Sequence, residues 1–252
     1  MTYPLRPAAG VAASHGSGLA RPEAYSNAQP NAYSNGRSQR AMPLTRNYEI
    51  AYLSRNNTLC DATRIAPLVP AFEEAFSAFA RGTLISTPTG PVAIEDLCPG
   101  DIVTTGTGPQ PLRWRGSISL VPDRARNAPL SRIPADSFGP QRPSDNLLLG
   151  DSARIFASKS ISSMSSPANW RDGETAIEVR PVAPVPLYHL VFDCQEIFQA
   201  NDLEVASYHP DHSAYARPAG SMAQLFLGMF PHLRDLDGFG ASIRDAPDRF
   251  VA

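Results

Sequence analysis

Histidines form the main group of residues in this sequence that could do chemistry. His189, His209 and His212, with Asp211 beside the last of them, carry side chains that can bind a divalent metal, and the His209-Pro210-Asp211-His212 spacing occurs in some metal sites. His189, however, lies within the strand-like run Tyr188-His189-Leu190, which favours histidines that are buried for structural reasons. We therefore predict that this cluster holds no metal.

Other chemical motifs are missing from the sequence. There is no dinucleotide-binding or phosphate-binding glycine loop, no nucleophile elbow and no zinc-protease helix motif. The three cysteines, Cys60, Cys98 and Cys194, are an odd number at long spacings, which indicates neither a disulfide framework nor a thiolate zinc site and suits a reducing compartment. We expect no cofactor.

Length and charge exclude some classes of partner. The 252 residues suffice for one principal domain with tails, and the formal net charge of −2 provides no field that would attract nucleic acid or an acidic membrane surface. No apolar run approaches eighteen residues, and the first residues lack the apolar segment of a signal peptide. The sequence thus predicts a cytoplasmic protein that binds neither nucleic acid nor membranes.

The elements that must position any site begin after a biased N-terminal segment. Residues 1–46 are rich in Ala, Ser, Asn, Gly and Pro and contain five arginines against one acid. Such a segment buries too little apolar surface to offset its ordering entropy, so we predict a disordered tail. An Ala-Tyr-Ser-Asn tetrad occurs twice in it, at 24–27 and 32–35. Two copies are too few to indicate a repeat architecture.

Residues 47–75 are predicted to form a strand and an amphipathic helix that pack on the main domain. Alternating apolar residues from Tyr48 to Leu53 predict the strand, and the Asn56-Asn57 turn signal allows a hairpin. Pro70 fits the first turn of a helix. The helix carries acidic residues where its dipole favours them and an apolar stripe with spacings i, i+4 and i+7, made of Phe72, Phe76 and Phe79.

Residues 76–210 have the texture of an all-β domain, with short apolar runs broken every eight to twelve residues by Gly, Pro or Asp. We expect residues 157–169, which are rich in serine and lack periodicity, to form a mobile loop. Predicted strands lie at Thr83–Ser86, Pro91–Ile94, Ile102–Thr105, Pro111–Leu120, Leu147–Phe156, Ile177–Val179, Leu187–Phe192 and Glu196–Ala200.

Residues 211–252 are predicted to contain a second helix and a tail. Ser221 is suited to be the N-cap of this helix, and Pro231 ends it. The helix residues 221–230 would pack on the domain or dock on an unknown protein partner, since their apolar surface extends beyond one face. The apolar face consists of Met222, Leu225, Phe226 and Met229, and is widened by Leu227 and Phe230.

The segment 79–103 contains a long ordered pattern, G-T-x-I-x-T-P-x-G followed by V-x-I-E-D-L-x-x-G-D-x-V, in the variant GTLISTPTG and VAIEDLCPGDIV. It resembles the opening of the Hint module shared by hedgehog autoprocessing domains and inteins, particularly the bacterial Hint-domain proteins. Three later segments are similar to that family: 110–116 (QPLRWRG), 146–156 (NLLLGDSARIF) and 188–210 (YHLVFDCQEIFQANDLEVASYHP). The resemblance implies a mainly β fold, a horseshoe-like Hint domain with a short helix before it and one after it.

The resemblance also implies where self-cleavage chemistry would reside. Family members that cleave themselves have a Cys or Ser directly before the Phe that leads to Gly-Thr, and its side chain attacks the preceding carbonyl with help from a histidine. In this chain the nucleophile position is Ala78, and the activating histidine position is Ala153. A further histidine of the last segment corresponds to Gln195, which has no titratable proton.

Two readings of the function follow. In the first, the chain is a catalytically degenerate Hint protein that acts as a binding or structural module. In the alternative hypothesis, the chain cleaves or splices itself. The nucleophile is then Ser77, one position before Ala78, or another residue, in which case the motif match assigns the nucleophile to the wrong position. The predicted helix disfavours Ser77, because a helical backbone does not present the neighbouring carbonyl for in-line attack.

Overall fold

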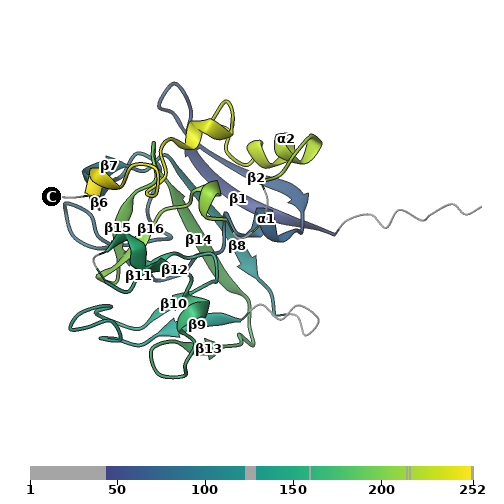
Figure 1. The fold of residues 1–252 in the computed structure, drawn as a ribbon. Coiled ribbons are helices and arrows are strands. Elements are labelled where there is room, and N and C mark those ends of the chain that lie inside the picture. Colours follow the sequence, from purple (N-terminus) through teal and green to yellow (C-terminus); the bar gives the residue numbers. More distant parts are fainter. Residues whose placement is uncertain (1–43, 123–128, 159, 214, 216, 251–252) are drawn as a thin grey trace, which may run out of the picture. The chain divides into compact units, whose positions relative to one another are not determined.

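The protein's computed structural model describes residues 44–122, 129–158, 160–213, 215 and 217–250, which belong to one compact unit, Met42–Ala252. Most of the expected tail 1–46, including both Ala-Tyr-Ser-Asn tetrads, lies outside the described residues. The first strand starts at Thr45, two residues before the expected boundary. The fold is mainly β, as predicted, and every strand pairing recorded within the described part is antiparallel (Figure 1).

Two sheets make up the fold, and distant segments of the chain alternate in both. The first sheet contains, in spatial order, β13 (Ile177–Val179), β9 (Leu130–Ile133), β10 (Leu147–Leu149), β3 (Phe79–Ala80), β14 (Val185–Val191), β8 (Trp114–Leu120), β1 (Thr45–Leu53) and β2 (Leu59–Pro67). The second contains β12 (Met164–Ser165), β11 (Ile155–Phe156), β16 (Leu203–Ala206), β15 (Ile197–Ala200), β4 (Leu84–Ile85) and β5 (Val92–Ala93), with β6 (Ile102–Thr105) paired to β15 and β7 (Gly108–Pro111) paired to β6.

Helical structure is short throughout the described residues. The two α-helices are α1 (Pro70–Glu73) and α2 (Ser221–Leu227). Within this part of the chain, no helix is both long and apolar enough to span a lipid bilayer. Turns of 3₁₀ helix occur at Ile161–Ser163, Pro167–Trp170, Pro210–His212, Leu236–Phe239 and Pro247–Phe250.

The segment upstream of Ala78 is built into the first sheet. The Asn56-Asn57 turn closes the β1–β2 hairpin, as predicted, and Asn57 adopts a left-handed φ of 56°. β1 then pairs with β8, in register from Glu49 opposite Ser117 to Tyr52 opposite Trp114. The hairpin therefore continues the sheet of the β domain rather than forming a structure of its own.

Two clusters of buried side chains fill the interior. We call the first the β-domain core, because it is formed by residues of the β domain itself. It consists mainly of Ala78, Phe79, Ile85, Ile94, Leu97, Val103, Leu112, Ile133, Leu147, Leu149, Ala153, Ile155, Leu190, Phe192, Phe198, Leu203 and Val205.

We call the second cluster the aromatic core, because rings from three parts of the chain meet in it. Phe76 packs against Tyr48 and Trp114, with ring centroids 4.8 and 5.1 Å apart, and Trp114 packs against Phe230 at 4.7 Å. The Trp114 indole N–H also donates to the Met229 carbonyl at 2.8 Å. The upstream segment, the β domain and the C-terminal segment thus share one core.

The predicted C-terminal helix exists but begins differently. Gly220, with φ 58°, is the N-cap and Ser221 is the first helical residue, so the prediction that Ser221 caps the helix is wrong. The helix ends at Leu227, so the prediction that it continues to Phe230 and is ended by Pro231 is also wrong. Phe226 of the helix is buried in the aromatic core, as are Met229 and Phe230 after its end, whereas Leu225 is 49% exposed. The internal side of this helix therefore packs on the domain. Docking of a partner through residues 221–230 stays a prediction.

The predicted loop at residues 157–169 is partly regular. It contains the 3₁₀ turn Ile161–Ser163, strand β12 paired with β11, and the start of a further turn at Pro167. The Ser163 hydroxyl donates to the carbonyls of Ser158 and Ser160, at 2.9 and 2.7 Å. Local hydrogen bonds between side chains and the backbone stabilise the turns of this segment. Such hydrogen bonds produce no periodic apolar pattern, so the sequence did not indicate them.

Candidate functional site

Ala78, the position expected for the family's nucleophile, lies directly before β3, a strand in the middle of the first sheet. The predicted helix through Phe79 is wrong: α1 ends at Glu73, a turn follows, and Phe79 pairs with Leu149 and Tyr188 on the two flanking strands. Strand pairing with two distant segments outweighs the helical spacing of the three phenylalanines. Ser77 therefore lies outside the helix, and the argument from helical geometry against it does not apply.

The backbone around Ala78 is held from both sides. The Ala78 N–H donates to the Tyr188 carbonyl at 3.1 Å, and the Ala78 carbonyl accepts from the Gly150 N–H at 2.8 Å. A Cβ atom at position 150 would lie 1.9 Å from the Ser77 carbonyl oxygen, so only glycine fits there. The Ser77 carbonyl, which a nucleophile at position 78 would attack, thus rests against the Gly150 main chain.

Ala153 occupies the place expected for the activating histidine, close to the same backbone. Its N–H donates to the Gly150 carbonyl at 3.1 Å, so Gly150 connects the two alanine positions. Ala78 and Ala153 are both completely buried and belong to the β-domain core. Neither methyl group can attack a carbonyl, polarise an amide or move a proton.

Gln195 stands at the position expected for a further histidine of the family, and both ends of its side-chain amide are hydrogen-bonded within the fold. Its side-chain amide donates to the Ser207 carbonyl at 3.1 Å, and its side-chain oxygen accepts from the Ile243 N–H at 2.9 Å. The side chain is 1% exposed. Both ends of the amide are therefore used to fasten the C-terminal segment to β15 and β16.

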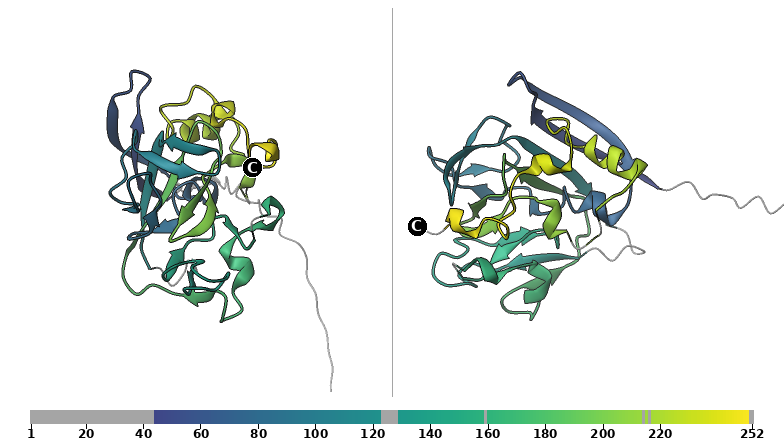
Figure 2. Two further views of the ribbon diagram at one scale, coloured as in Figure 1. Left: turned by 90° about the vertical axis from the view of Figure 1, so that its left-hand side faces the viewer. Right: turned by 45° about the horizontal axis from the view of Figure 1, so that its top comes forward.

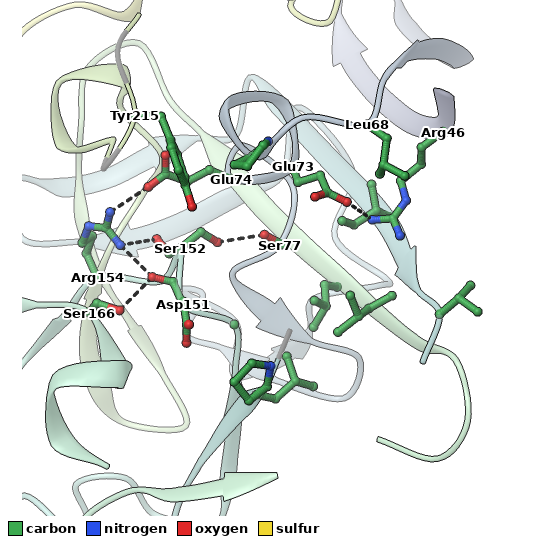
Figure 3. A pocket seen from close by; sticks show the side chains of 18 residues that line it. Arg46, Leu68, Glu73, Glu74, Ser77, Asp151, Ser152, Arg154, Ser166 and Tyr215 are labelled. Atoms are coloured by element: carbon green, nitrogen blue, oxygen red, sulfur yellow. Dashed lines mark hydrogen bonds and ion pairs between the residues drawn. The ribbon is translucent and has the colours of Figure 1, made fainter. Parts of the chain in front are cut away.

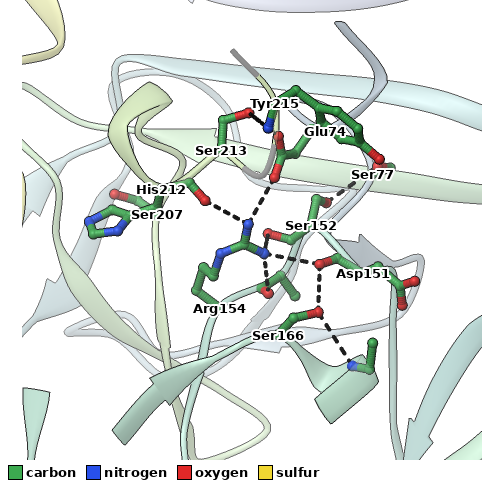
Figure 4. A network of polar contacts seen from close by, with 12 residues as sticks. Glu74, Ser77, Asp151, Ser152, Arg154, Ser166, Ser207, His212, Ser213 and Tyr215 are labelled. Atoms are coloured by element: carbon green, nitrogen blue, oxygen red, sulfur yellow. Dashed lines mark hydrogen bonds and ion pairs between the residues drawn. The ribbon is translucent and has the colours of Figure 1, made fainter. Parts of the chain in front are cut away.

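Arg154, directly after Ala153, is a central polar residue that the sequence analysis gave no role. One guanidinium nitrogen donates to the carbonyls of Asp151, Ser152 and Ala153, each at 3.0 Å, and the other contacts the Glu74 carboxylate at 2.8 Å and the His212 carbonyl at 2.6 Å (Figure 4). Arginine carries hydrogen-bond donors only, in a planar fork, so Arg154 can hold several carbonyl oxygens and a carboxylate of this loop at once.

Glu74 is the partner that makes this clamp possible. The sequence pattern placed Glu74 at a helix N-terminus, but the residue follows the last turn of α1 and is 7% exposed. Its carboxylate contacts Arg154 and accepts a hydrogen bond from the Ser213 hydroxyl. A buried acid needs such a partner. The adjacent acids Glu73 and Glu74 within an otherwise apolar run are the sequence signal that could have indicated this pair.

A cavity of about 550 Å³ lies beside the Ser77-Ala78 junction (Figure 3). Apolar side chains such as Leu68 and Leu187 line part of its wall, and Ser77, Ser152 and Arg154 line another part. The Ser77 hydroxyl lies 3.3 Å from the Ser152 hydroxyl, its one hydrogen-bond partner within the described part of the chain. A serine hydroxyl is not a general base, so this contact does not by itself activate Ser77.

The histidines lie on the other side of Ser152, around a cavity of about 10 Å³ that has room for one water molecule. His189 is buried, and its ring contacts those of Phe79 and Tyr208 edge-on, at 5.5 and 5.4 Å. Burial lowers the pKa of His189 to about 3, and the Arg154 guanidinium contributes. A histidine with so low a pKa is neutral at pH 7 and a weak base.

His209 and His212 approach each other, but their ring nitrogens have different surroundings. Their ring centroids are 6.2 Å apart, and the His209 ring nitrogens are engaged by the Asp211 N–H and the Gly240 carbonyl. Burial lowers the pKa of His212 to about 4, and both of its ring nitrogens lack a partner among the described residues. Among those residues, no group of three His, Cys, Asp or Glu side chains could hold a metal ion.

Comparison with known proteins adds a family and two solved structures. A family model described as the Hint domain matches residues 77–212. A bacterial intein-like domain from Clostridium thermocellum is 14% identical, with a TM-score of 0.41 over 52% of this chain and 99% of that domain. The gp41-1 intein is 14% identical, with a TM-score of 0.37 over 53% of this chain and 98% of that one. No curated protein matches the chain.

Proposed function

Because the chain belongs to the Hint-domain family, we propose that it is a Hint fold that no longer cleaves itself and acts as a binding or structural module. The observation that carries this proposal is the methyl group of Ala78. It is buried directly before β3, at the position that the motifs match to the nucleophile of self-cleaving members. The two positions expected to hold histidines that assist the nucleophile are occupied by Ala153 and Gln195.

The upstream segment gives the proposal a second, independent support. In a self-cleaving protein the residues before the nucleophile are the part that is released. Here these residues contribute β1 to the first sheet and place Tyr48, Phe72 and Phe76 in the aromatic core. Breaking the chain at Ser77-Ala78 would leave this segment bound by strand pairing and buried rings, so cleavage would release nothing.

A second candidate function, self-cleavage by Ser77, is favoured by one observation. The serine lies in irregular backbone, and its partner Ser152 also lines the small cavity that His189 lines. In this function the Ser77 hydroxyl attacks the Phe76 carbonyl, the hydroxyl proton moves to a base, and an ester replaces the Phe76-Ser77 peptide bond. The low pKa of His189 disfavours this route.

Trapping with hydroxylamine tests the proposal. Hydroxylamine or an added thiol would intercept an ester or thioester, so we expect neither reagent to cut the unmodified chain at Phe76-Ser77 or Ser77-Ala78. We expect Ala78→Cys combined with Ala153→His to cut the chain slowly before position 78. Neither single variant should do so, because a missing general base costs a factor of about 10²–10⁴ and a missing nucleophile removes the pathway. The products must be measured under denaturing conditions, since the fragments stay associated.

Hydroxylamine cleavage of the unmodified chain at Phe76-Ser77 or Ser77-Ala78 would contradict the proposal, whereas a cut at Asn35-Gly36 is the reagent's ordinary reaction with an Asn-Gly bond. Ser77→Ala then separates the two remaining explanations. If this substitution abolishes cleavage, Ser77 is the nucleophile; if cleavage continues, the nucleophile lies elsewhere. Ser166→Ala is the matched control, because its hydroxyl donates to the Asp151 carbonyl in the same network but does not contact Ser77.

A further inference from the structure

The outer strand of the first sheet, β2, has an unused edge. β2 is the last strand of the sheet order, and within the described part of the chain it pairs with β1 alone. Nine successive residue pairs join the two strands without a bulge. Figure 2 shows this hairpin along the margin of the ribbon in both views. A regular edge strand of this length is a template for pairing with another strand.

The register identifies which backbone groups of β2 are free. Leu68 donates to the Leu44 carbonyl at one end of the hairpin, and Ser54 donates to the Thr58 carbonyl at the other. Hydrogen-bonded and non-bonded pairs alternate in an antiparallel ladder, so even-numbered residues of β2 bond to β1. The N–H and C=O groups of Leu59, Asp61, Thr63 and Ile65 therefore point outward.

The side chains of these outward-bonding residues lie on the exposed face of the sheet. Ile65 is 71% exposed and Leu59 is 46% exposed, while Asp61 and Thr63 are also exposed. The intervening side chains lie on the opposite face, where Ala66 is buried in the aromatic core and Ala62 packs against it, while Arg64 is exposed. The edge thus combines free backbone groups with two large aliphatic side chains that lie six positions apart in the sequence.

We propose that β2 is a self-association edge, which pairs with β2 of a second copy of this chain about a twofold axis through Ala62. In this antiparallel arrangement Leu59 lies opposite Ile65 of the second copy, and Asp61 lies opposite Thr63 of the second copy. Each of these pairs exchanges two backbone hydrogen bonds. Leu59 and Ile65 therefore form two aliphatic cross-strand pairs, one on each side of the axis.

Neighbouring registers are less favourable for identifiable reasons. An axis through Asp61 places the two Asp61 carboxylates opposite each other, and an axis through Arg64 does the same for the guanidinium groups. An axis through Thr63 places Leu59 opposite Pro67, which has no N–H, and Asp61 opposite Ile65. A twofold axis between two residues would pair odd-numbered with even-numbered positions. The interior face of one copy would then continue as the solvent-exposed face of the other copy. The strand's own sequence therefore selects a second copy in one register.

Sedimentation of the full chain tests the association. A strand-to-strand interface is small, so we expect a reversible dimer that becomes evident at about 100 µM. Ile65→Lys should weaken association about tenfold, because it removes an aliphatic pair on each side of the axis. Val182→Lys is the matched control, since Val182 is 98% exposed and lies outside the edge. A chain that stays monomeric at several hundred µM would overturn the proposal.

Cysteine cross-linking tests the register. Across the axis, Ala62 faces Ala62 of the second copy in a non-bonded pair, whose Cα separation of about 4.5 Å permits a disulfide. Ala62→Cys should therefore yield a disulfide-linked dimer on oxidation, with the bond mapped to position 62 by peptide mass. Thr63→Cys should cross-link at least fivefold less, because its Cα atoms would be more than about 7 Å apart. Equal cross-linking of both variants, or of neither, would refute this register.

Discussion

A chain that starts at Ala78 is expected to lose cooperative unfolding and to aggregate. This truncation removes β1, β2 and α1, and with them Tyr48, Phe72 and Phe76 from the aromatic core. Each loss of a buried large aromatic side chain costs about 3–5 kcal/mol, and the total stability of a domain is about 5–15 kcal/mol. Trp114 and Phe230 would be left exposed on the remaining domain. Thermal unfolding followed by tryptophan fluorescence measures the effect.

The matched control is a chain that starts at Met42, which keeps every described residue. We expect it to unfold in one cooperative transition. Residues 42–77 supplied as a separate chain should restore that transition to the truncated protein, because strand pairing and ring packing do not require the peptide bond at Ser77-Ala78. A soluble fragment that starts at Ala78 and melts cooperatively on its own would show that the upstream segment is not part of the domain.

Acidification from pH 7.5 to pH 4.5 is expected to destabilise the fold strongly. Burial lowers the pKa of His189 to about 3 and those of His212 and His232 to about 4, while histidines of the unfolded chain titrate near 6.5. Below pH 6.5 the unfolded state therefore binds protons that the folded state does not. The free energy of unfolding falls by up to about 1.4 kcal/mol per pH unit for each histidine until its folded pKa is reached.

Replacement of His189 isolates one part of this dependence. His189→Phe keeps an aromatic ring between Phe79 and Tyr208 but removes the titrating group. Urea unfolding of both proteins at a series of pH values should show a smaller loss of stability for the variant between pH 6.5 and 4.5, by roughly 2–3 kcal/mol. Hydrogen bonds from Glu174 and Thr175 lower the pKa of the Asp172 carboxyl to about 2, so this group titrates below the pH range of the experiment. An identical pH dependence would contradict the burial of His189 as a neutral ring.

Local patterns in the sequence predicted those parts of the fold that local interactions determine. The alternation around Ile50 and the Asn56-Asn57 turn identified the hairpin, and the glycine and aspartate breaks identified strands such as Ile102–Thr105. Gly90 and Gly100 adopt positive φ values of 118° and 105°, as their places in the turn motifs suggest. The family resemblance, confirmed over residues 77–212, then indicated how these strands assemble.

Long-range contacts explain what the patterns did not predict. Helical spacing extended α1 to Phe79, because pairing of that residue with Leu149 and Tyr188 leaves no local signal. Strands β9 and β16 were not singled out, and the serine-rich segment was taken for a loop. The Glu74–Arg154 pair joins residues 80 positions apart, and only the fold brings them together. That Ala78 and Ala153 stand at the family's nucleophile and histidine positions rests on contiguous motifs and stays a prediction.

The mass of the freshly purified, unmodified chain in denaturant tests the central claim most directly. The proposal that this Hint fold has lost self-cleavage predicts one species of the full 252 residues, unchanged after days at neutral pH. Denaturant is essential, because the β1–β8 pairing and the aromatic core would hold two fragments together in native buffer. A pair of fragments that meet at Ser77-Ala78 or Phe76-Ser77, and whose masses sum to that of the chain plus one water, would contradict the account.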